Sequence, residues 1–188
     1  MSRWQPDARA RLQEAALALY GERGYEQTTV AEIAERAGLT KRTFFRYFAD
    51  KREVLFWGSE VLEQQMVAAI EAAPASASTL SVIGTALAAA AARFEEFREF
   101  AGLRYRLVAS SRELQERELI KAASLAAGLS RALRARGLGD TAAALAARTC
   151  LIVMQVTLEQ WIDDPNRTPF EQIAREALAQ LREIASAR

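Results

Sequence analysis

The sequence predicts an all-α protein in two parts, an N-terminal three-helix helix-turn-helix domain over residues 1–52 and a C-terminal helical bundle over residues 53–188. Three observations support this prediction. Alanine is abundant, and β-branched residues are scattered instead of alternating, which favours helices over strands. Apolar residues recur at helical spacing along most of the chain. Hydrophobic residues make up 51% of the chain and charged residues 26%, which is enough apolar material for a buried core.

The first two helices are defined by an apolar stripe and by capping residues. A helix over about residues 7–23 is predicted, with Gly24 as its stop. Thr29 and Glu32 have the spacing of a capping box and predict the start of a second, short helix, which Gly38 ends. The apolar stripe of the first helix consists of Leu12, Ala15, Ala16, Leu19 and Tyr20.

The third helix, with the sequence KRTFFRYF, is predicted to begin after Thr40, its cap. Phe44 and Phe48 lie one turn apart and are expected to face inward with Leu39. About three residues around a glycine separate this helix from the second one, as in a helix-turn-helix whose second member enters the major groove. A helix of this length is about 12 Å long, and the groove is about 12 Å wide.

The outward side of the third helix is predicted to bind DNA. Lys41, Arg42 and Thr43 occupy its first turn, where side chains meet base edges, and arginine often binds guanine through two hydrogen bonds. Tyr47 is predicted to contact a phosphate, and Lys51 to do so beside backbone amides. The predicted DNA-binding residues are Thr29, Thr40, Lys41, Arg42, Thr43, Phe45, Tyr47 and Lys51.

Basic charge gathers in the N-terminal part, although the whole chain has a net charge of only +1. This pattern indicates one basic patch and not a general polyanion binder. Two members of the patch, Arg46 and Arg52, are left open between a DNA contact and a solvated surface charge. Residues 36–52 contain a single acidic residue, Asp50, and six basic ones: Arg36, Lys41, Arg42, Arg46, Lys51 and Arg52.

The residue types present argue against an enzyme on chemical grounds. The chain has no histidine and a single cysteine, Cys150, so Ser-His-Asp and Cys-His machinery and His/Cys zinc sites are excluded. No glycine-rich loop of phosphate-binding spacing is present. We therefore predict no catalytic residues, no metal site and no cofactor. Cys150 lies in an apolar run and is expected to be buried.

Neither a membrane span nor a secretory signal is predicted. The longest purely apolar run covers residues 86–92, far short of a span, and the N-terminus has no apolar core like that of a signal sequence. The expectation is a cytoplasmic protein with no membrane partner.

The C-terminal part is predicted to consist of helices throughout. Asp50 and Glu53 form a second potential capping box, which predicts one long helix over residues 51–72. Thr79 is predicted to cap the next helix, which ends near Phe94. Further helices are predicted up to Gly137, over residues 140–163, and from the segment Thr168-Pro169-x-Glu171 onward.

The segment TTVAEIAERAGLTKRTFFRYFADKREVL resembles the DNA-binding signature of the TetR family of bacterial transcriptional regulators. The resemblance extends over about residues 9–56. Two positions depart from the family pattern, because Phe45 stands where tyrosine is more common and Arg42 where a small residue is common. The residues that carry the resemblance are Thr28-Thr29, Ile33-Ala34, Ala37-Gly38-Leu39-Thr40, Tyr47-Phe48, Lys51 and Leu55.

The resemblance implies a homodimeric repressor that binds a palindromic operator in double-stranded DNA and is released by a small-molecule ligand. The last two helices would pair with those of a second copy, although their apolar faces also fit a core within one chain. The alternative is a small-molecule-binding or protein-interaction module without specific DNA binding, which salt-dependent DNA binding would distinguish. Candidate ligand-binding residues, each of which also fits a core position, are Trp57, Phe94, Phe97, Tyr105, Met154, Gln155 and Trp161.

Overall fold

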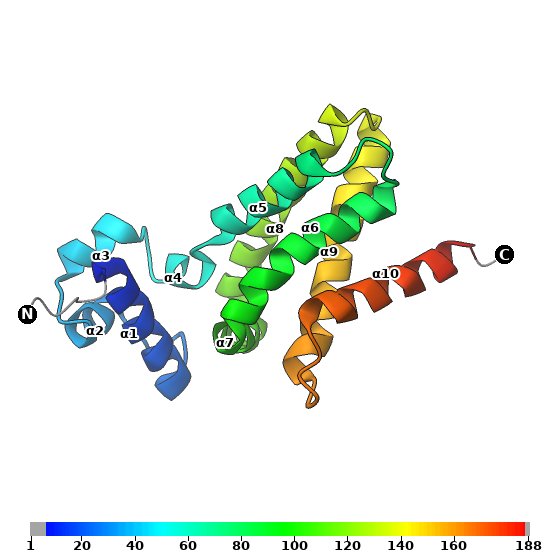
Figure 1. Ribbon diagram of the computed structural model, residues 1–188. Coiled ribbons are helices and arrows are strands. Elements are labelled where there is room, and N and C mark those ends of the chain that lie inside the picture. Colours follow the sequence, from blue (N-terminus) through cyan, green and yellow to red (C-terminus); the bar gives the residue numbers. More distant parts are fainter. Residues whose placement is uncertain (1–6, 187–188) are drawn as a thin grey trace, which may run out of the picture. The chain divides into compact units, whose positions relative to one another are not determined.

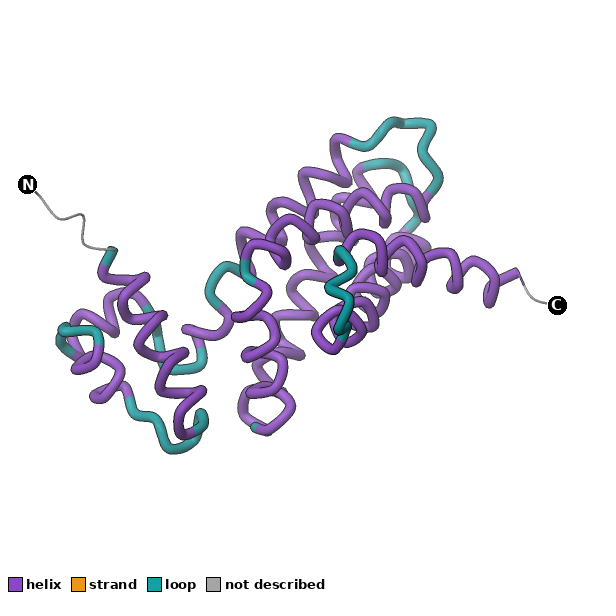
Figure 2. Tube along the Cα trace, turned by 60° about the horizontal axis from the view of Figure 1, so that its bottom comes forward, coloured by secondary structure: helices purple, strands orange, loops and turns teal. Residues whose placement is uncertain are grey.

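The protein is helical throughout the part that its computed structural model describes, residues 7–186 (Figure 1). Ten α-helices joined by short loops make up this range, and it contains no strand (Figure 2). The predicted all-α class is confirmed. The first six residues of the predicted N-terminal domain lie outside the described range.

The three N-terminal helices are α1 (Ala8–Arg23), α2 (Val30–Arg36) and α3 (Lys41–Tyr47). The Thr29 side chain accepts a hydrogen bond from the backbone of Glu32, whose carboxylate bonds back to the backbone of Thr29, so the predicted capping box is formed. The three helices pack on one another around a shared core. The fully or almost fully buried members of this core are Leu12, Ala16, Tyr20, Ile33, Ala34, Phe44 and Phe48.

Contacts between residues divide the chain into two compact units. The first comprises Met1–Trp57 together with Gly102–Leu119, and the second comprises Gly58–Ala101 and Ile120–Arg188. The end of α7 (Arg98–Ser110) and the start of α8 therefore pack with the N-terminal helices. The domain boundary after residue 52 remains a prediction, and it does not anticipate this contribution from the middle of the chain.

The prediction of a single long helix over residues 51–72 is wrong. The structure has a short helix, α4 (Glu53–Phe56), and then α5 (Ser59–Ala72), with Gly58 between them at φ 88°. A left-handed conformation of this kind favours glycine and interrupts the helix. The Arg93 guanidinium also lies 2.0 Å from where a Cβ of Gly58 would stand, so a side chain could not be accommodated without movement.

The second unit is a bundle in which α6 (Thr79–Glu96) packs against α5, α9 (Asp140–Asp163) and α10 (Phe170–Ser186). The cap of α6 is Ser78, whose hydroxyl accepts a hydrogen bond from the Ser81 backbone at 3.3 Å, and not the predicted Thr79. Its remaining long helix is the C-terminal part of α8 (Arg112–Ala135). The largest fully buried side chains of the unit are Trp161, Phe170, Met66, Ile70 and Leu87.

A polar contact fixes the end of this bundle around Trp161, which is completely buried. The indole Nε1 of Trp161 and the backbone N of Phe170 both donate to one carboxylate oxygen of Glu95, at 3.1 and 2.7 Å. Arg98 donates to the carbonyl oxygen of Trp161 at 2.7 Å, and its guanidinium lies 4.2 Å from the centre of the indole ring. The buried indole N–H therefore has the acceptor that a buried tryptophan requires.

Among the described helices, α9 alone is long and apolar enough to cross a membrane. The core helix of a soluble protein satisfies the same criterion of length and composition, so this is weak evidence for a membrane span. The uninterrupted apolar runs of the sequence are too short to indicate α9 as such a helix. One side of α9 packs against α6 and α10, and the other side is exposed in the single chain.

Candidate nucleic-acid interface

The α3 helix is held by two phenylalanines, and its opposite side is left exposed. Phe44 is completely buried and Phe48 is 3% exposed, with their ring centres 5.4 Å apart. The adjacent Phe45 is 56% exposed and meets Phe44 edge to face. This arrangement turns Lys41 and Arg42 to solvent, as the sequence predicts, and neither side chain has an ion-pair partner in the described part of the chain.

The threonines of the predicted site serve first to shape the helix ends. The Thr40 hydroxyl accepts a hydrogen bond from the backbone N of Thr43 at 3.1 Å and lies 3.0 Å from the Thr43 hydroxyl. The Thr29 hydroxyl donates to the Glu32 carboxylate at 2.7 Å. That hydrogen bond is the main reason why the pKa of Glu32 is lowered. Thr29 and Thr40 are thus caps, and the DNA contacts predicted for all three threonines stay predictions.

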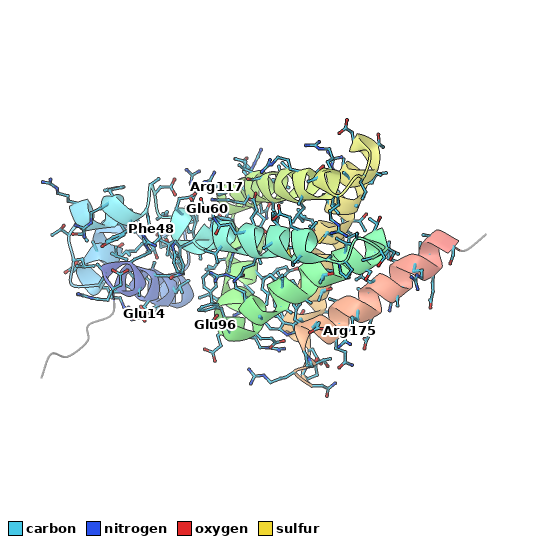
Figure 3. The ribbon with its side chains drawn as sticks, turned by 45° about the horizontal axis from the view of Figure 1, so that its top comes forward. Glu14, Phe48, Glu60, Glu96, Arg117 and Arg175 are labelled. Atoms are coloured by element: carbon cyan, nitrogen blue, oxygen red, sulfur yellow. The ribbon has the colours of Figure 1, made fainter. Side chains whose placement is uncertain are left out.

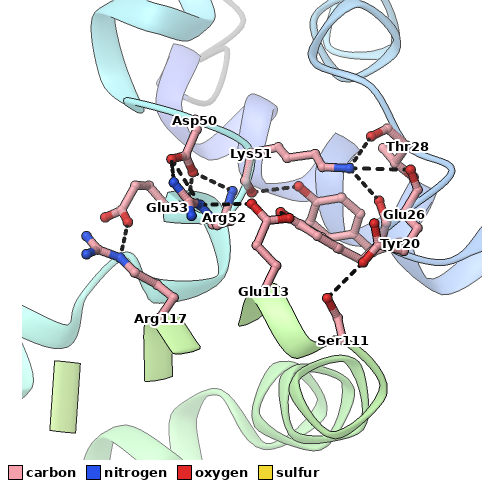
Figure 4. A network of polar contacts seen from close by, with 11 residues as sticks. Tyr20, Glu26, Thr28, Asp50, Lys51, Arg52, Glu53, Ser111, Glu113 and Arg117 are labelled. Carbon is pink, nitrogen blue, oxygen red and sulfur yellow. Dashed lines mark hydrogen bonds and ion pairs between the residues drawn. The ribbon is translucent and has the colours of Figure 1, made fainter. Parts of the chain in front are cut away.

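Lys51 has a structural role that the sequence did not reveal (Figure 4). Its ammonium group donates to the backbone carbonyls of Tyr25 at 2.9 Å and Thr28 at 3.0 Å, with a longer contact to Glu26 at 3.4 Å. It also lies 4.2 Å from the centre of the Tyr25 ring. An ammonium group has three N–H donors, and these contacts use them all. Lys51 therefore holds the loop between α1 and α2, and its predicted phosphate contact stays a prediction.

Tyr20 secures the other side of the same segment. Its phenol donates to the carbonyl oxygen of Lys51 at 2.7 Å, and burial, followed by the nearby Asp50 carboxylate, raises the pKa of the phenol. The group therefore remains a neutral donor at physiological pH. Lys51 is consequently fixed to α1 through its backbone and to the following loop through its side chain.

A second group of polar contacts links the start of α8 to the helix-turn-helix, within the first unit (Figure 4). The Tyr25 phenol donates to Glu113 at 3.1 Å, and the same carboxylate lies 3.3 Å from the Arg52 guanidinium. Ser111 donates to Glu26 at 2.8 Å. These contacts come from a segment that the sequence analysis did not connect with the site.

Arg52 is a structural residue of this group and not a free charge. Its guanidinium pairs with Asp50 at 2.5 Å, and its backbone N donates to the same side chain at 2.8 Å. Burial acts to raise the pKa of Asp50, but the hydrogen bonds from Arg52 lower it below its ordinary value. Arg117 makes a further pair of 2.6 Å with Glu53 of α4 (Figure 4).

Arg11 of α1 stabilises the turn of the helix-turn-helix itself. Its guanidinium donates to the carbonyl oxygen of Ala37, at the end of α2, and weakly to that of Gly38 at 3.4 Å. Gly38 has φ 65°, and the backbone N of Leu39 bonds to Ala34 at 2.8 Å. The orphan carbonyls at the end of α2 are thus satisfied, and α3 starts at a fixed angle.

The predicted ligand-binding residues of the second unit are divided between its core and its surface. Phe94 and Trp161 are packed in the core with Phe170, and Met154 packs against the same core. Gln155 is exposed and donates to Glu159 on its own helix at 3.1 Å. The remaining three are half-buried Tyr105 and exposed Trp57, both in the first unit, and exposed Phe97 in the second.

Two open depressions mark the surface of the second unit. One, of about 560 Å³, is lined by residues 95–100 and Arg167, including the predicted Phe97. The other, of about 740 Å³, is a groove between α6 and α10. Its floor includes Leu87 and Leu178, and its rim includes Arg175, which is exposed on α10 (Figure 3). Sequence reasoning missed this groove because it follows from the packing of two distant helices.

Residues 7–186 contain no cluster of histidine, cysteine or acidic side chains that could hold a metal ion. Cys150 is buried as predicted, and burial raises the pKa of its thiol to about 12. The thiol is therefore protonated at physiological pH and packs as a small apolar group.

Comparison with known proteins gives matches to both parts of the chain. Residues 12–56 match the model of bacterial regulatory proteins of the tetR family. The chain is 38% identical over 88 residues to the HTH-type transcriptional regulator TcmR of Streptomyces glaucescens. These 88 residues are 47% of this chain. The match spans only 39% of the length of that relative.

Solved structures are similar to nearly the whole chain. A putative TetR-family regulator from Syntrophomonas wolfei has a TM-score of 0.70 at 17% identity, covering 96% of this chain and 95% of that one. Thermus thermophilus FadR, in complex with lauroyl-CoA, has a TM-score of 0.62 at 21% identity, covering 96% of each chain. Bacillus subtilis FadR, in complex with stearoyl-CoA, has a TM-score of 0.65 at 18% identity, covering 92% of this chain and 96% of that one.

At these identities the structural likeness shows the fold alone. Residues 12–56 therefore carry the helix-turn-helix of the tetR family of bacterial regulatory proteins.

Proposed function

We propose that this protein is a homodimeric, cytoplasmic transcriptional repressor that binds a palindromic operator and is released by a small-molecule ligand. The observation that carries the proposal is the exposed first turn of α3, where Lys41 and Arg42 face solvent above the buried Phe44. A short helix presented in this way fits the major groove and supplies donors to base edges. The match of residues 12–56 to the tetR family supports the same function.

A second copy of the chain is the partner that best fits the exposed side of α9. Leu145 and Ile152 are each 62% exposed and Val156 is 40% exposed, and their spacing places them along one stripe of the helix. Ile184, near the end of α10, is 72% exposed. A two-fold pair that covers these side chains would carry two copies of α3, which read the halves of a palindrome about 34–36 Å apart.

The effector is proposed to be an amphipathic molecule with an apolar chain and an anionic group. The groove between α6 and α10 has an apolar floor, and Arg175 and Arg182 line it. The two FadR structures, which share the fold, hold acyl-CoA ligands. An effector that binds better to a dimer with a different spacing of its α3 helices would lower operator affinity by shifting the population.

Footprinting on the DNA that flanks its own gene tests the proposal directly. We expect a protected palindrome at moderate salt, with two protected segments about one helical turn apart. Addition of lauroyl-CoA tests the effector class and is expected to reduce protection. Folded protein that protects no segment would contradict specific DNA binding and favour the alternative of a ligand-binding or interaction module.

Substitution of Arg42 is expected to change sequence discrimination more than general affinity. If Arg42 binds a guanine through two hydrogen bonds, Arg42→Ala costs about 1–3 kcal/mol at that base pair. Binding measured on a set of operators that differ at single positions should show the loss at particular base pairs. An equal loss on every sequence would instead assign Arg42 to the DNA backbone.

A further inference from the structure

Two arginines from different helices flank the ring of Tyr47 within the first unit. The Arg46 guanidinium lies 4.8 Å from the centre of the ring, and that of Arg9 lies 5.4 Å from it. Arg9 is also 5.8 Å from the centre of the Trp57 ring. Arg9 comes from α1 and Arg46 from α3, so the group forms only where these helices pack together.

No carboxylate among residues 7–186 pairs with the positive charges of this group. Neither Arg9 nor Arg46 forms an ion pair in the described part of the protein, whereas Arg23, Arg36 and Arg52 each pair with a carboxylate. The Nε atom of Arg9 is buried and has no hydrogen-bond partner among residues 7–186. Both guanidinium groups therefore have charge available for an anion at the edge of this group.

The phenol of Tyr47 supplies a donor for such an anion. It accepts a hydrogen bond from Arg46 at 3.1 Å, and its own hydrogen has no acceptor within the described residues. A hydroxyl group can accept and donate at the same time. The site therefore combines two planar guanidinium groups with one hydroxyl donor, which are the groups that bind phosphate oxygens best.

We infer that Arg9, Arg46 and Tyr47 form a phosphate-binding site for the DNA backbone; of these three, the sequence predicts a phosphate contact only for Tyr47 and leaves Arg46 open. The inference depends on the proposed DNA-binding function. Arg46 lies one helical turn after Arg42, so the site continues the base-reading side of α3 along the helix. Arg9 extends the interface to α1, and both arginines position α3 without reading sequence.

The test measures full-length protein on a random-sequence duplex of about 30 base pairs, with affinity determined at several salt concentrations. Arg9→Gln and Arg46→Gln are each expected to reduce the slope of log affinity against log salt by about 0.9 per copy for one lost phosphate contact. Arg46→Lys keeps the charge and should retain the slope. Tyr47→Phe should weaken binding by a few-fold with the slope unchanged, since it removes only a neutral donor.

A matched control is Arg112→Gln, which removes an equal charge from the same unit at a side chain that is 91% exposed. Its slope should equal that of the wild type. If Arg9→Gln lowers the free energy of unfolding and leaves the slope unchanged, Arg9 only packs α1 against α3 and the inference is overturned for it. Unchanged slopes in both glutamine variants overturn the whole site, whereas wild-type protein that binds no duplex overturns the proposed function as well.

Discussion

Lys51→Met is expected to lower the free energy of unfolding by about 2 kcal/mol, because it removes hydrogen bonds from a charged donor to backbone carbonyls. The carbonyls of Tyr25 and Thr28, at 2.9 and 3.0 Å, lose this donor. They belong to the loop that leads into the capped start of α2. Urea unfolding followed by circular dichroism measures the loss.

The same change should weaken DNA binding indirectly. If about 1.4 kcal/mol is needed to restore the arrangement of α2 and α3 on binding, affinity falls about tenfold on every sequence. Lys51 makes this contribution by positioning the loop, so the salt dependence of binding should change little.

Lys41→Met is the matched control, since it removes the same charge from an exposed side chain of α3. Its free energy of unfolding should stay within about 0.5 kcal/mol of the wild type, while its DNA affinity falls. The opposite pattern for Lys51→Met, with unchanged unfolding and a reduced salt slope, would show that Lys51 contacts phosphate as its position in the sequence suggests.

The helix-turn-helix was predictable because its determinants are local. Thr29 and Glu32 are three residues apart and form the capping box, and Gly24 and Gly38 adopt the positive φ values that end helices. The burial of Phe44 follows from the helical spacing of the apolar residues Phe44 and Phe48. In each case the residues that decide the conformation lie within one or two helical turns of one another.

Gly58 is a local signal of the break between α4 and α5, but a contact from a residue far away in the sequence also supports the break. Arg104 of α7 donates to the carbonyl oxygen of Leu55 at 3.1 Å and lies 4.9 Å from the centre of the Phe56 ring. It thereby satisfies a carbonyl that the interrupted helix leaves without an intrahelical partner. The apolar periodicity over residues 51–72 contains no sign of this contact.

The contacts of α8 with the helix-turn-helix were unpredictable for a similar reason. Glu113 meets Tyr25 across 88 positions of the chain, and Ser111 meets Glu26 across 85. A surface glutamate and serine in an amphipathic helix carry no local signal of such partners. For the predicted ligand-binding residues, the residue type alone does not separate a core position from a pocket position. Aromatic residues such as Phe94 and Trp161 suit both.

Ile152→Glu is expected to convert the proposed dimer to monomers without unfolding the chain. The Ile152 side chain is 62% exposed in the single chain, so a carboxylate there remains hydrated and costs the monomer little. In a two-fold pair that covers this side of α9, both copies would bury the new charge near apolar groups. We expect the dimer dissociation constant to rise at least about 100-fold, equivalent to about 2.7 kcal/mol, as measured by analytical ultracentrifugation.

Leu119→Glu separates this effect from a general cost of adding an acid to the surface. Leu119 is 69% exposed on α8, outside the helices proposed to form the dimer, and its variant should remain dimeric and bind operator normally. Ile152→Glu should lose operator binding together with dimerisation, because one α3 reads only half of the palindrome. If Leu119→Glu dissociates and Ile152→Glu does not, the interface lies on α8, and the exposed apolar stripe of α9 requires a different partner.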